Sequence, residues 1–176
     1  MRSLRSVLFS LLLLGLIVAS GLMTGSPRRM ISGGHHGAIS VLDGDTLRIG
    51  KRTIRLLAID APETRQQCLD EAGRRWPCGQ AASARLSQLV REPGLVCVSR
   101  AIDRFGRALA ICSTNAVPDI GEALVGEGLA TTYAGRGGDL YDGAEQEARE
   151  ARRGMWRGSF DPPREWRSIH PRGGSG

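Results

Sequence analysis

The sequence has very little lysine and histidine, and its cysteines do not follow a zinc-binding pattern. None of the four cysteines is in a Cys-x-x-Cys spacing, which argues against a structural zinc site. The pair His35–His36 stands in a Gly-rich segment with no Cys or carboxylate beside it, so we interpret it as solvated sequence. Lys51 is the only lysine among 24 basic residues. The net charge of +6 is therefore carried by arginine, which indicates either a polyanionic partner or the codon usage of a GC-rich genome.

The N-terminal region has the pattern of an export signal. Arg2 and Arg5 precede the apolar stretch Val7 to Met23, which we interpret as a signal peptide. The alternative is an uncleaved membrane anchor, because this length is at the lower limit for a spanning helix. Residues 24–37 are expected to form a flexible linker. The even number of cysteines agrees with export, so we expect a periplasmic or secreted protein, or one anchored to the inner membrane by residues 7–23.

Residues 41–64 bring four carboxylates and the strand arginine Arg55 close together in the sequence. Residues 54–59 are typical of a buried strand, and the alternation of side chains places Arg55 on an apolar face. A guanidinium in that position needs an anion, either a protein carboxylate or a ligand phosphate. The strand ends before Pro62, and a Gly-centred turn precedes a second short strand at residues 46–49. If the two strands are neighbours, Asp45 and Asp60 converge and suit a hard cation, with Asp43, Glu63 and Arg55 nearby.

Three segments in this order carry a resemblance to a known family. They are DGDT at residues 43–46, RLLAIDAPET at residues 55–64 and DRFGR at residues 103–107. Together they resemble the staphylococcal nuclease (thermonuclease) family, a calcium-dependent phosphodiesterase on an OB-type barrel. The resemblance covers roughly residues 39–156. It implies a mainly β protein with α-helices (α+β), a five-stranded OB-fold barrel with about three packed helices at residues 38–160, and a C-terminal tail at 161–176.

The resemblance also implies a role for individual residues. Asp45 and Asp60 match the family's Ca²⁺-binding carboxylates, and the carbonyl of Ala61 matches its backbone ligand. Glu63 matches the glutamate that activates the attacking water, while Arg55 and Arg107 match the arginines that bind the scissile phosphate. Substrate-binding positions depart from the family: Arg104 and Phe105 replace a lysine and a tyrosine. A base-stacking tyrosine is expected at Tyr133, with Tyr141 as the alternative.

The remaining pattern predicts elements around this site. Amphipathic spacing predicts helices at residues 80–90, 120–128 and 140–155, the last with Glu145 among its outward charges. A hairpin of residues 95–101 and 107–112 turns at 103–106 and places Cys97 opposite Cys112, within disulfide reach. We expect a second disulfide, Cys68–Cys78, after Glu63; free buried thiols are the alternative. Residues 65–79 are interpreted as a disulfide-tied surface loop with Trp76 covering the barrel, or else as a nucleic-acid contact through Arg74, Arg75 and Trp76.

The functional hypothesis is an exported, monomeric, Ca²⁺-dependent nuclease that acts on single-stranded DNA and RNA. By the family resemblance, its products carry 3′-phosphates. The alternative is a catalytically inactive OB-fold module of the cell envelope that binds nucleic acid or protein. Such a module is expected to lose its carboxylates and arginines, because unneutralised carboxylates repel phosphate. This chain keeps the whole set.

Overall fold

The computed structural model describes residues 29–32, 38–133 and 139–170. The apolar stretch at residues 7–23, the His35–His36 pair and part of the loop after Tyr133 lie outside this range. Within the described residues, no helix combines the length and the apolar character needed to cross a membrane.

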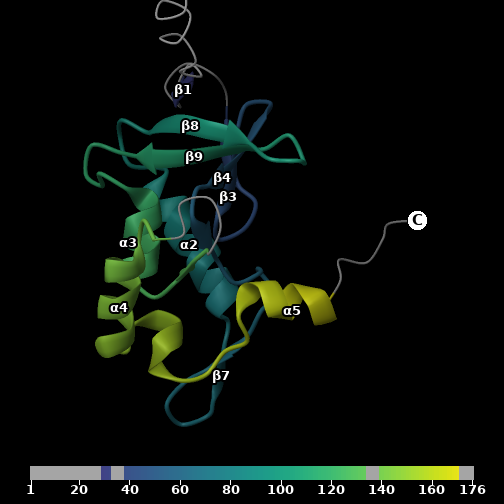
Figure 1. Ribbon diagram of the computed structural model, residues 1–176, viewed down its shortest axis with the longest axis vertical. Helices are drawn as coiled ribbons and strands as arrows, with labels where there is room; N and C mark the ends of the chain where they lie inside the picture. Colours follow the sequence, from purple (N-terminus) through teal and green to yellow (C-terminus); the bar gives the residue numbers. More distant parts are fainter. Residues whose placement is uncertain (1–28, 33–37, 134–138, 171–176) are drawn as a thin grey trace, which may run out of the picture.

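The centre of the fold is a curled six-stranded sheet with the strand order β1-β8-β9-β4-β3-β2 (Figure 1). All neighbouring strands are antiparallel except β4 and β9, which are parallel. The strands are β1 (Arg29–Ser32), β2 (Ile39–Val41), β3 (Thr46–Ile49), β4 (Arg52–Leu56), β8 (Val96–Ile102) and β9 (Ala108–Ser113). The last five form the predicted OB-type barrel, which confirms the α+β fold class.

The first strand, β1, was not predicted. Residues 29–32 were expected in a linker, but they pair antiparallel with β8, with Ile31 opposite Cys97. Ile31 is buried at the edge of the core. Two apolar residues between an arginine pair and a Gly-rich segment form too short a pattern for a strand to be predicted from the sequence.

Three helices pack around the sheet, as the sequence predicted. They are α2 (Cys78–Leu89), α3 (Ile120–Gly126) and α4 (Asp142–Glu150). Helix α2 buries the apolar side chains of Ala82, Leu86 and Leu89 in one core with Leu47 and Ile54 of the sheet, which matches the predicted amphipathic spacing. Helix α3 begins at Asp119, whose carboxylate accepts hydrogen bonds from two backbone N–H groups.

The predicted strand at residues 54–59 is interrupted. Strand β4 ends at Leu56, and Ala58 adopts a positive φ of 61°, which turns the chain out of the large sheet. The next strand, β5 (Ile59–Asp60), pairs instead with β10 (Thr131–Thr132). The continuous apolar run conceals this break, because both sides of the turn are buried. As a result, Asp60 is directed back toward β3 and β4.

The third helix is shorter than predicted, and one of its charges is not exposed. It ends at Glu150, and Gly154 then begins the 3₁₀ helix η1 (Gly154–Arg157) with a φ of 53°. A Cβ at Gly154 would lie 2.6 Å from the carbonyl oxygen of Glu127, so the close approach requires glycine. Glu145 was predicted on the solvent face but is buried, because its carboxylate accepts hydrogen bonds from the backbone and hydroxyl of Thr132.

Both predicted disulfides are present, and no described cysteine is free. Cys97 and Cys112 are register partners in the β8–β9 hairpin. Cys68–Cys78 ties the hairpin of β6 (Cys68–Leu69) and β7 (Arg75–Trp76) to the start of α2.

The hairpin of β6 and β7 packs on the C-terminal part of the chain and not over the barrel. Trp76 and Phe160 pack against a second, small core formed by Met155 and the Cys68–Cys78 disulfide. A final helix, α5 (Pro163–Ile169), occupies part of the region that was expected to be a loose tail, and Figure 1 shows it projecting from the lower part of the molecule.

Candidate functional site

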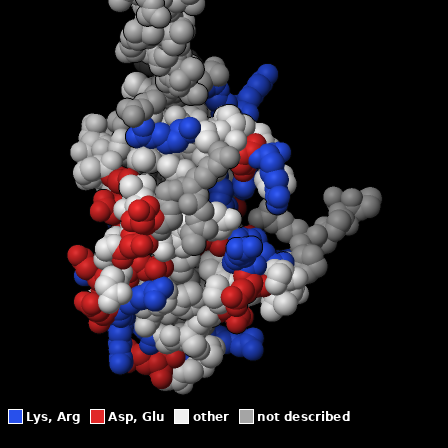
Figure 2. Space-filling view, in the orientation of Figure 1, with Lys and Arg blue, Asp and Glu red and all other residues white. Residues whose placement is uncertain are grey.

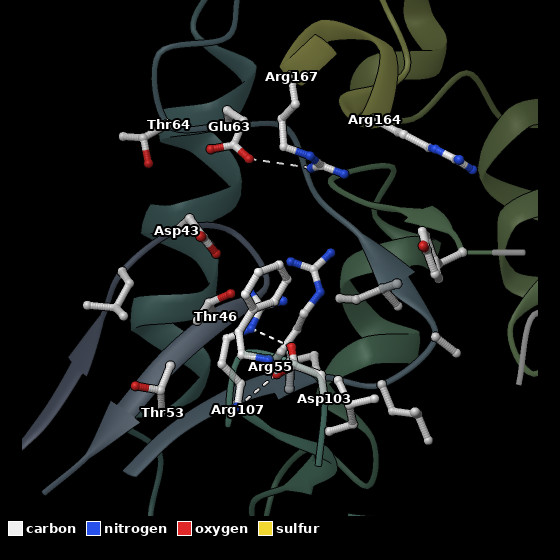
Figure 3. A pocket seen from close by; sticks show the side chains of 18 of the residues that line it. Asp43, Thr46, Thr53, Arg55, Glu63, Thr64, Asp103, Arg107, Arg164 and Arg167 are labelled. Atoms are coloured by element: carbon white, nitrogen blue, oxygen red, sulfur yellow. Dashed lines mark hydrogen bonds and ion pairs between the residues drawn. The ribbon is translucent and has the colours of Figure 1, made fainter. Parts of the chain in front are cut away.

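A cavity of about 1180 Å³ opens between the sheet, the β8–β9 turn and helix α5 (Figure 3). Its walls come from segments that are far apart in the sequence. Of the predicted site residues, Arg55, Glu63, Arg104, Phe105, Arg107 and Tyr133 line the cavity.

Arg55 lies at the floor of the cavity and joins the two buried aspartates. Its Nη1 donates to Oδ1 of Asp45 at 2.7 Å, and its Nη2 donates to Oδ1 of Asp60 at 2.8 Å. The strand register fixes this geometry, since Arg55 pairs with Thr46 in β3 and Asp60 follows the turn at Ala58. The predicted convergence of Asp45 and Asp60 is therefore seen in the structure. Neither aspartate lines the cavity itself, because both are almost completely buried.

The electrostatics of this floor are dominated by burial. Burial raises the pKa of the Asp45 carboxyl to about 7, although the nearby Arg55 acts in the opposite direction. Burial alone would lower the pKa of the Arg55 guanidinium, but the charges of Asp45 and Asp60 outweigh it and raise that pKa. Two buried carboxylates thus share one strand arginine.

Backbone contacts hold Asp45 as well. Oδ2 of Asp45 accepts a hydrogen bond from the N–H of Ala61 at 3.1 Å, and the N–H of Asp45 donates to Oδ1 of Asp43. Gly44 makes the close packing of this turn possible, because a Cβ there would lie 2.7 Å from the Cβ atoms of Ala61 and Ala82. The sequence motif DGD is therefore a tight turn packed on α2.

Glu63 is presented from a loop that rests on the start of α2. The backbone N–H of Gln66 donates to the carbonyl of Glu63 at 2.7 Å, and the fully buried Gln66 side chain accepts from the N–H of Glu63. A Cβ at Gly79 would overlap the carbonyl oxygen of Glu63, so this glycine allows the loop to lie directly on the helix. The Cys68–Cys78 disulfide closes the segment that follows.

The β8–β9 turn forms another wall of the cavity. Arg107 is held by Asp103, with Nε to Oδ2 at 2.7 Å, and its guanidinium lies 5.4 Å from the ring centre of Phe105. Backbone N–H groups in the turn donate to the carboxylate of Asp103 and lower its pKa, although its partial burial acts in the opposite direction. Arg104 is exposed, and its guanidinium lies 4.8 Å from the ring centre of Phe105. The turn therefore presents two cations and one aromatic ring.

The two tyrosines occupy different environments. Tyr133 is 40% exposed and lines the cavity, and its backbone N–H donates to the carbonyl of Ala58. Tyr141 is buried and donates a hydrogen bond to Asp119 at 2.8 Å, and burial raises its pKa far above the usual value. Tyr141 supports helix α3, so the alternative placement at the site does not hold.

The structure adds a site residue that was not predicted from the sequence. Arg167 of α5 donates from Nη2 to Oδ2 of Asp60 at 2.9 Å and from Nη1 to Oε1 of Glu63 at 3.4 Å. Figure 3 shows Arg167 facing Glu63 above the cavity, with Arg55 and Arg107 below them. Burial acts to lower the pKa of Arg167, but the bond to Asp60 and the nearby carboxylates raise it. Arg167 is a charged residue in a segment without apolar periodicity, so the sequence contains no pattern that predicts its place in the site.

Helix α5 is held in place by the preceding segment. The amide of Gln66 donates to the carbonyl of Asp161 at 2.7 Å, and the N–H of Leu69 donates to the carbonyl of Ser159 at 2.8 Å. Pro163 is buried at the start of the helix. The loop that carries Glu63 and the segment that carries Arg167 are therefore fixed to each other.

The donor set at the floor fits a hard cation. Asp45 and Asp60 offer carboxylate oxygens, with side-chain exposures of 3% and 5%, which are the ligands that hard cations prefer. Nowhere in the described part of the chain do three or more His, Cys, Asp or Glu side chains gather in a metal-holding arrangement. A cation here would need backbone carbonyl and water ligands in addition to the two aspartates. Calcium ions in proteins commonly have ligands of these kinds.

The fold and the cavity together define an OB-type domain in which arginines and buried carboxylates meet, a composition suited to a phosphate-containing ligand. Comparisons with known proteins give the family. Residues 53–158 match the family described as staphylococcal nuclease homologue, and the chain belongs to that family.

Named relatives cover most of the chain. It is 34% identical over 148 residues to the succinoglycan biosynthesis protein ExoI of Rhizobium meliloti, covering 82% of this chain and 75% of the relative. It is 30% identical over 149 residues to micrococcal nuclease of Shigella flexneri, covering 73% of this chain and 78% of the relative. A probable endonuclease, LCL3 of Verticillium alfalfae, is 29% identical over 142 residues, which cover 73% of this chain and 46% of the relative.

Proposed function

We propose that the protein is an exported, Ca²⁺-dependent nuclease that hydrolyses phosphodiester bonds of single-stranded DNA and RNA. The observation that carries the proposal is the convergence of Arg55, Asp45 and Asp60 at the floor of a cavity that Glu63 and Arg107 also line. The membership in the nuclease family and two relatives named as nucleases support the reaction class.

Each residue has a role that suits its environment. Arg55 has five N–H donors, of which the two aspartates use two, so donors remain for a phosphate in the cavity. Arg107 donates to the same phosphate from the β8–β9 turn. Glu63 accepts the proton of the attacking water, and the two arginines stabilise the charge that develops on the phosphoryl oxygens. The attack displaces the 5′-oxygen and leaves a 3′-phosphate.

The metal would be held by Asp45, Asp60 and the carbonyl of Ala61. A bound Ca²⁺ ion supplies electrostatic stabilisation of negative charge on the phosphate. The turn residues Arg104 and Phe105, together with Tyr133, are placed to bind the neighbouring nucleotides by charge and stacking. The protein acts as a monomer in this proposal.

Export rests on two features. The described cysteines are all in disulfides, which persist in the periplasm or outside the cell. The apolar stretch Val7 to Met23 after Arg2 and Arg5 would direct export, and would either be cleaved or remain as an inner-membrane anchor.

The direct test is cleavage of labelled single-stranded DNA and RNA by the purified protein with its disulfides intact, in Ca²⁺ and in chelator. We expect Ca²⁺-dependent cutting, products whose 3′ ends become extendable only after phosphatase treatment, and loss of cutting in the Arg55→Ala/Arg107→Ala variant. Cutting that persists in chelator would contradict the calcium dependence. Cutting that survives the double substitution would contradict the phosphate-binding roles.

A second candidate is a binding module of the cell envelope that does not cleave nucleic acid. It is favoured by one observation, the 34% identity to a relative named for succinoglycan biosynthesis. The retained carboxylates and arginines favour the nuclease. They suit a cation and a phosphate, and a module that only contacts a polysaccharide has no need of either. Binding of single-stranded DNA without cutting, in Ca²⁺, Mg²⁺ and Mn²⁺ alike, would decide for the module.

A further inference from the structure

The path from the cavity to the buried aspartates is covered by two guanidinium groups. Asp45 and Asp60 are 2% and 3% exposed, and neither forms part of the cavity wall. Arg55 and Arg167 do line the wall, and both bond Asp60. Each oxygen of the Asp60 carboxylate is thus paired with a different arginine, so an ion that enters from the cavity meets a positive charge first.

The two arginines differ in how firmly they are held. Arg55 lies in β4, inside the six-stranded sheet, and its side chain is 17% exposed with an ion pair to each aspartate. Arg167 lies on a seven-residue helix near the C-terminus, and its side chain is 30% exposed. Its second bond, to Glu63, is longer at 3.4 Å. Arg167 is therefore the group that can leave at the smaller cost in packing and hydrogen bonding.

We propose that Arg167 competes with the divalent cation for Asp60. In the cation-free protein its guanidinium pairs with Asp60 and with the neighbouring Glu63, and cation binding displaces it into the cavity, where the substrate phosphates lie in the proposed function. This proposal rests on the proposed function, because it assumes a cation at Asp45 and Asp60. It assigns α5, which lies beyond the family match at residues 53–158, to the active site.

The sign of the effect separates this role from a purely structural one. A guanidinium beside the same carboxylate repels a divalent cation, so removing its charge should tighten cation binding. If Arg167 instead only held Asp60 and Glu63 in position for the cation, its removal should weaken binding, as the loss of outer partners of metal ligands commonly does.

The experiment is calorimetric titration of Ca²⁺ into the purified full-length protein with its disulfides intact, as wild type and as three variants. Arg167→Gln removes the charge, Arg167→Lys keeps it, and Arg164→Gln is the matched control. Arg164 is on the same helix, lines the same cavity and points away from Glu63 in Figure 3, and none of its described contacts is an ion pair. Arg164→Gln changes the net charge by the same amount as Arg167→Gln. Circular dichroism of each variant confirms that the domain is folded.

We expect Arg167→Gln to bind Ca²⁺ about tenfold more tightly than wild type, the size expected when one repelling unit charge beside a partly exposed site is removed. Arg167→Lys should tighten binding less than Arg167→Gln, because it keeps the charge but cannot span Asp60 and Glu63 as arginine does. Arg164→Gln should stay within about threefold of wild type, since its side chain lies away from the carboxylates.

Three results would overturn the proposal. Unchanged or weaker binding by Arg167→Gln, with wild type binding Ca²⁺, refutes the competition and leaves the nuclease hypothesis intact. Equal tightening by Arg164→Gln shows that the effect is long-range charge alone. If no form of the protein binds Ca²⁺, the competition and the calcium dependence of the proposed function both fail.

Discussion

Arg55 combines a structural and a chemical role in one side chain. Its guanidinium bridges Asp45, in the turn before β3, and Asp60 of β5, and it still faces the cavity. A planar group with several donors can do this, whereas a lysine ammonium is a single point of charge and cannot span two carboxylates in fixed directions. The arginine is thus required by the geometry of the pair as well as by the charge.

This requirement gives a prediction for Arg55→Lys. We expect a loss of at least about 100-fold in turnover and of roughly 1–3 kcal/mol in the free energy of unfolding, because one buried carboxylate loses its charged partner. Single-turnover cleavage assays and urea denaturation measure the two effects. The control is Arg85→Lys, whose partner Glu127 is 37% exposed, and we expect it to cost less than about 1 kcal/mol. Equal losses in both variants would argue against a special role for Arg55.

Glu63 should separate chemistry from metal binding. It lines the cavity but is not one of the two buried aspartates, so Glu63→Gln should lower turnover by about 100-fold or more while Ca²⁺ affinity changes only a few-fold. Asp45→Ala should weaken Ca²⁺ binding and turnover together. Cleavage assays at saturating Ca²⁺ and calorimetry give the two quantities. Similar, modest losses for both variants would contradict this division of roles.

Among the elements, the segment between β5 and α2, which includes the β6–β7 hairpin, contributes both to stability and to the site. It carries Glu63, packs through Gln66 on the C-terminal segment and is closed by Cys68–Cys78. The other disulfide, Cys97–Cys112, lies within the β8–β9 hairpin at register-paired positions. The two disulfides have similar sequence separations of 10 and 15 residues but different relations to the cavity.

Removing the two disulfides should therefore have different effects on activity. We expect Cys68→Ala/Cys78→Ala and Cys97→Ala/Cys112→Ala each to lower the free energy of unfolding by roughly 2–3 kcal/mol, from loop entropy. Under conditions where both remain folded, only the first should lose cleavage activity, because it releases the Glu63 loop. Denaturation curves and cleavage rates measured at low temperature test this. Equal loss of activity would show that the loop does not depend on its disulfide.

Sequence patterns predicted the elements whose apolar residues repeat regularly. The β8–β9 hairpin and the pairing of Cys97 with Cys112 were predicted, although an irregularity between Ser99 and Ala101 shifts the register by one residue near the turn. Helix α2 was predicted from its spacing of Ala82, Leu86 and Leu89. The turn at Ala58 could not be predicted in this way, because a positive φ at a buried alanine leaves the run of apolar residues unbroken. Helix α5 has no repeat of apolar residues, so its residues were interpreted as a tail.

The same contrast holds for the site. Asp45, Asp60, Glu63, Arg55 and Arg107 lie in short motifs, and the structure brings them to one cavity and its floor. Arg167 reaches Asp60 across 107 residues of sequence, and the placement depends on the packing of Asp161 and Ser159 against the loop after Glu63. Contacts of this kind are set by tertiary structure and leave no local pattern.

Over the whole molecule, charge is unevenly distributed. Figure 2 shows most acidic side chains gathered on the left of the view, where Figure 1 places α3 and α4, with some basic ones among them lower down. Basic side chains lie over the upper part, and both signs occur at the right. The net charge of +6 is therefore compatible with one acidic face. A polyanion is expected to approach from the arginine-rich side, where the cavity contains Arg104 and Arg107.

This distribution predicts the salt dependence of substrate binding. Arg104→Gln should weaken binding of a single-stranded oligonucleotide and reduce the slope of log affinity against log salt by about 0.7, the value for one phosphate contact on a single strand. Fluorescence anisotropy at several salt concentrations measures the slope. Arg74→Gln is the control, since Arg74 pairs with Asp70 in the β6–β7 hairpin and does not line the cavity. A reduced slope in the control as well would indicate diffuse attraction rather than a contact.

The pairing of β5 with β10 has a consequence for how the molecule folds. Asp60 is held by Thr131, which follows it by 71 residues, and by Arg167, which follows it by 107 residues. Contacts of such high sequence separation form late and slow the folding of a domain. A growing chain that already contains Asp45 and Arg55 thus still lacks the partners that fix Asp60, and the complete cluster of charges forms only when the C-terminal third has been synthesised and has folded.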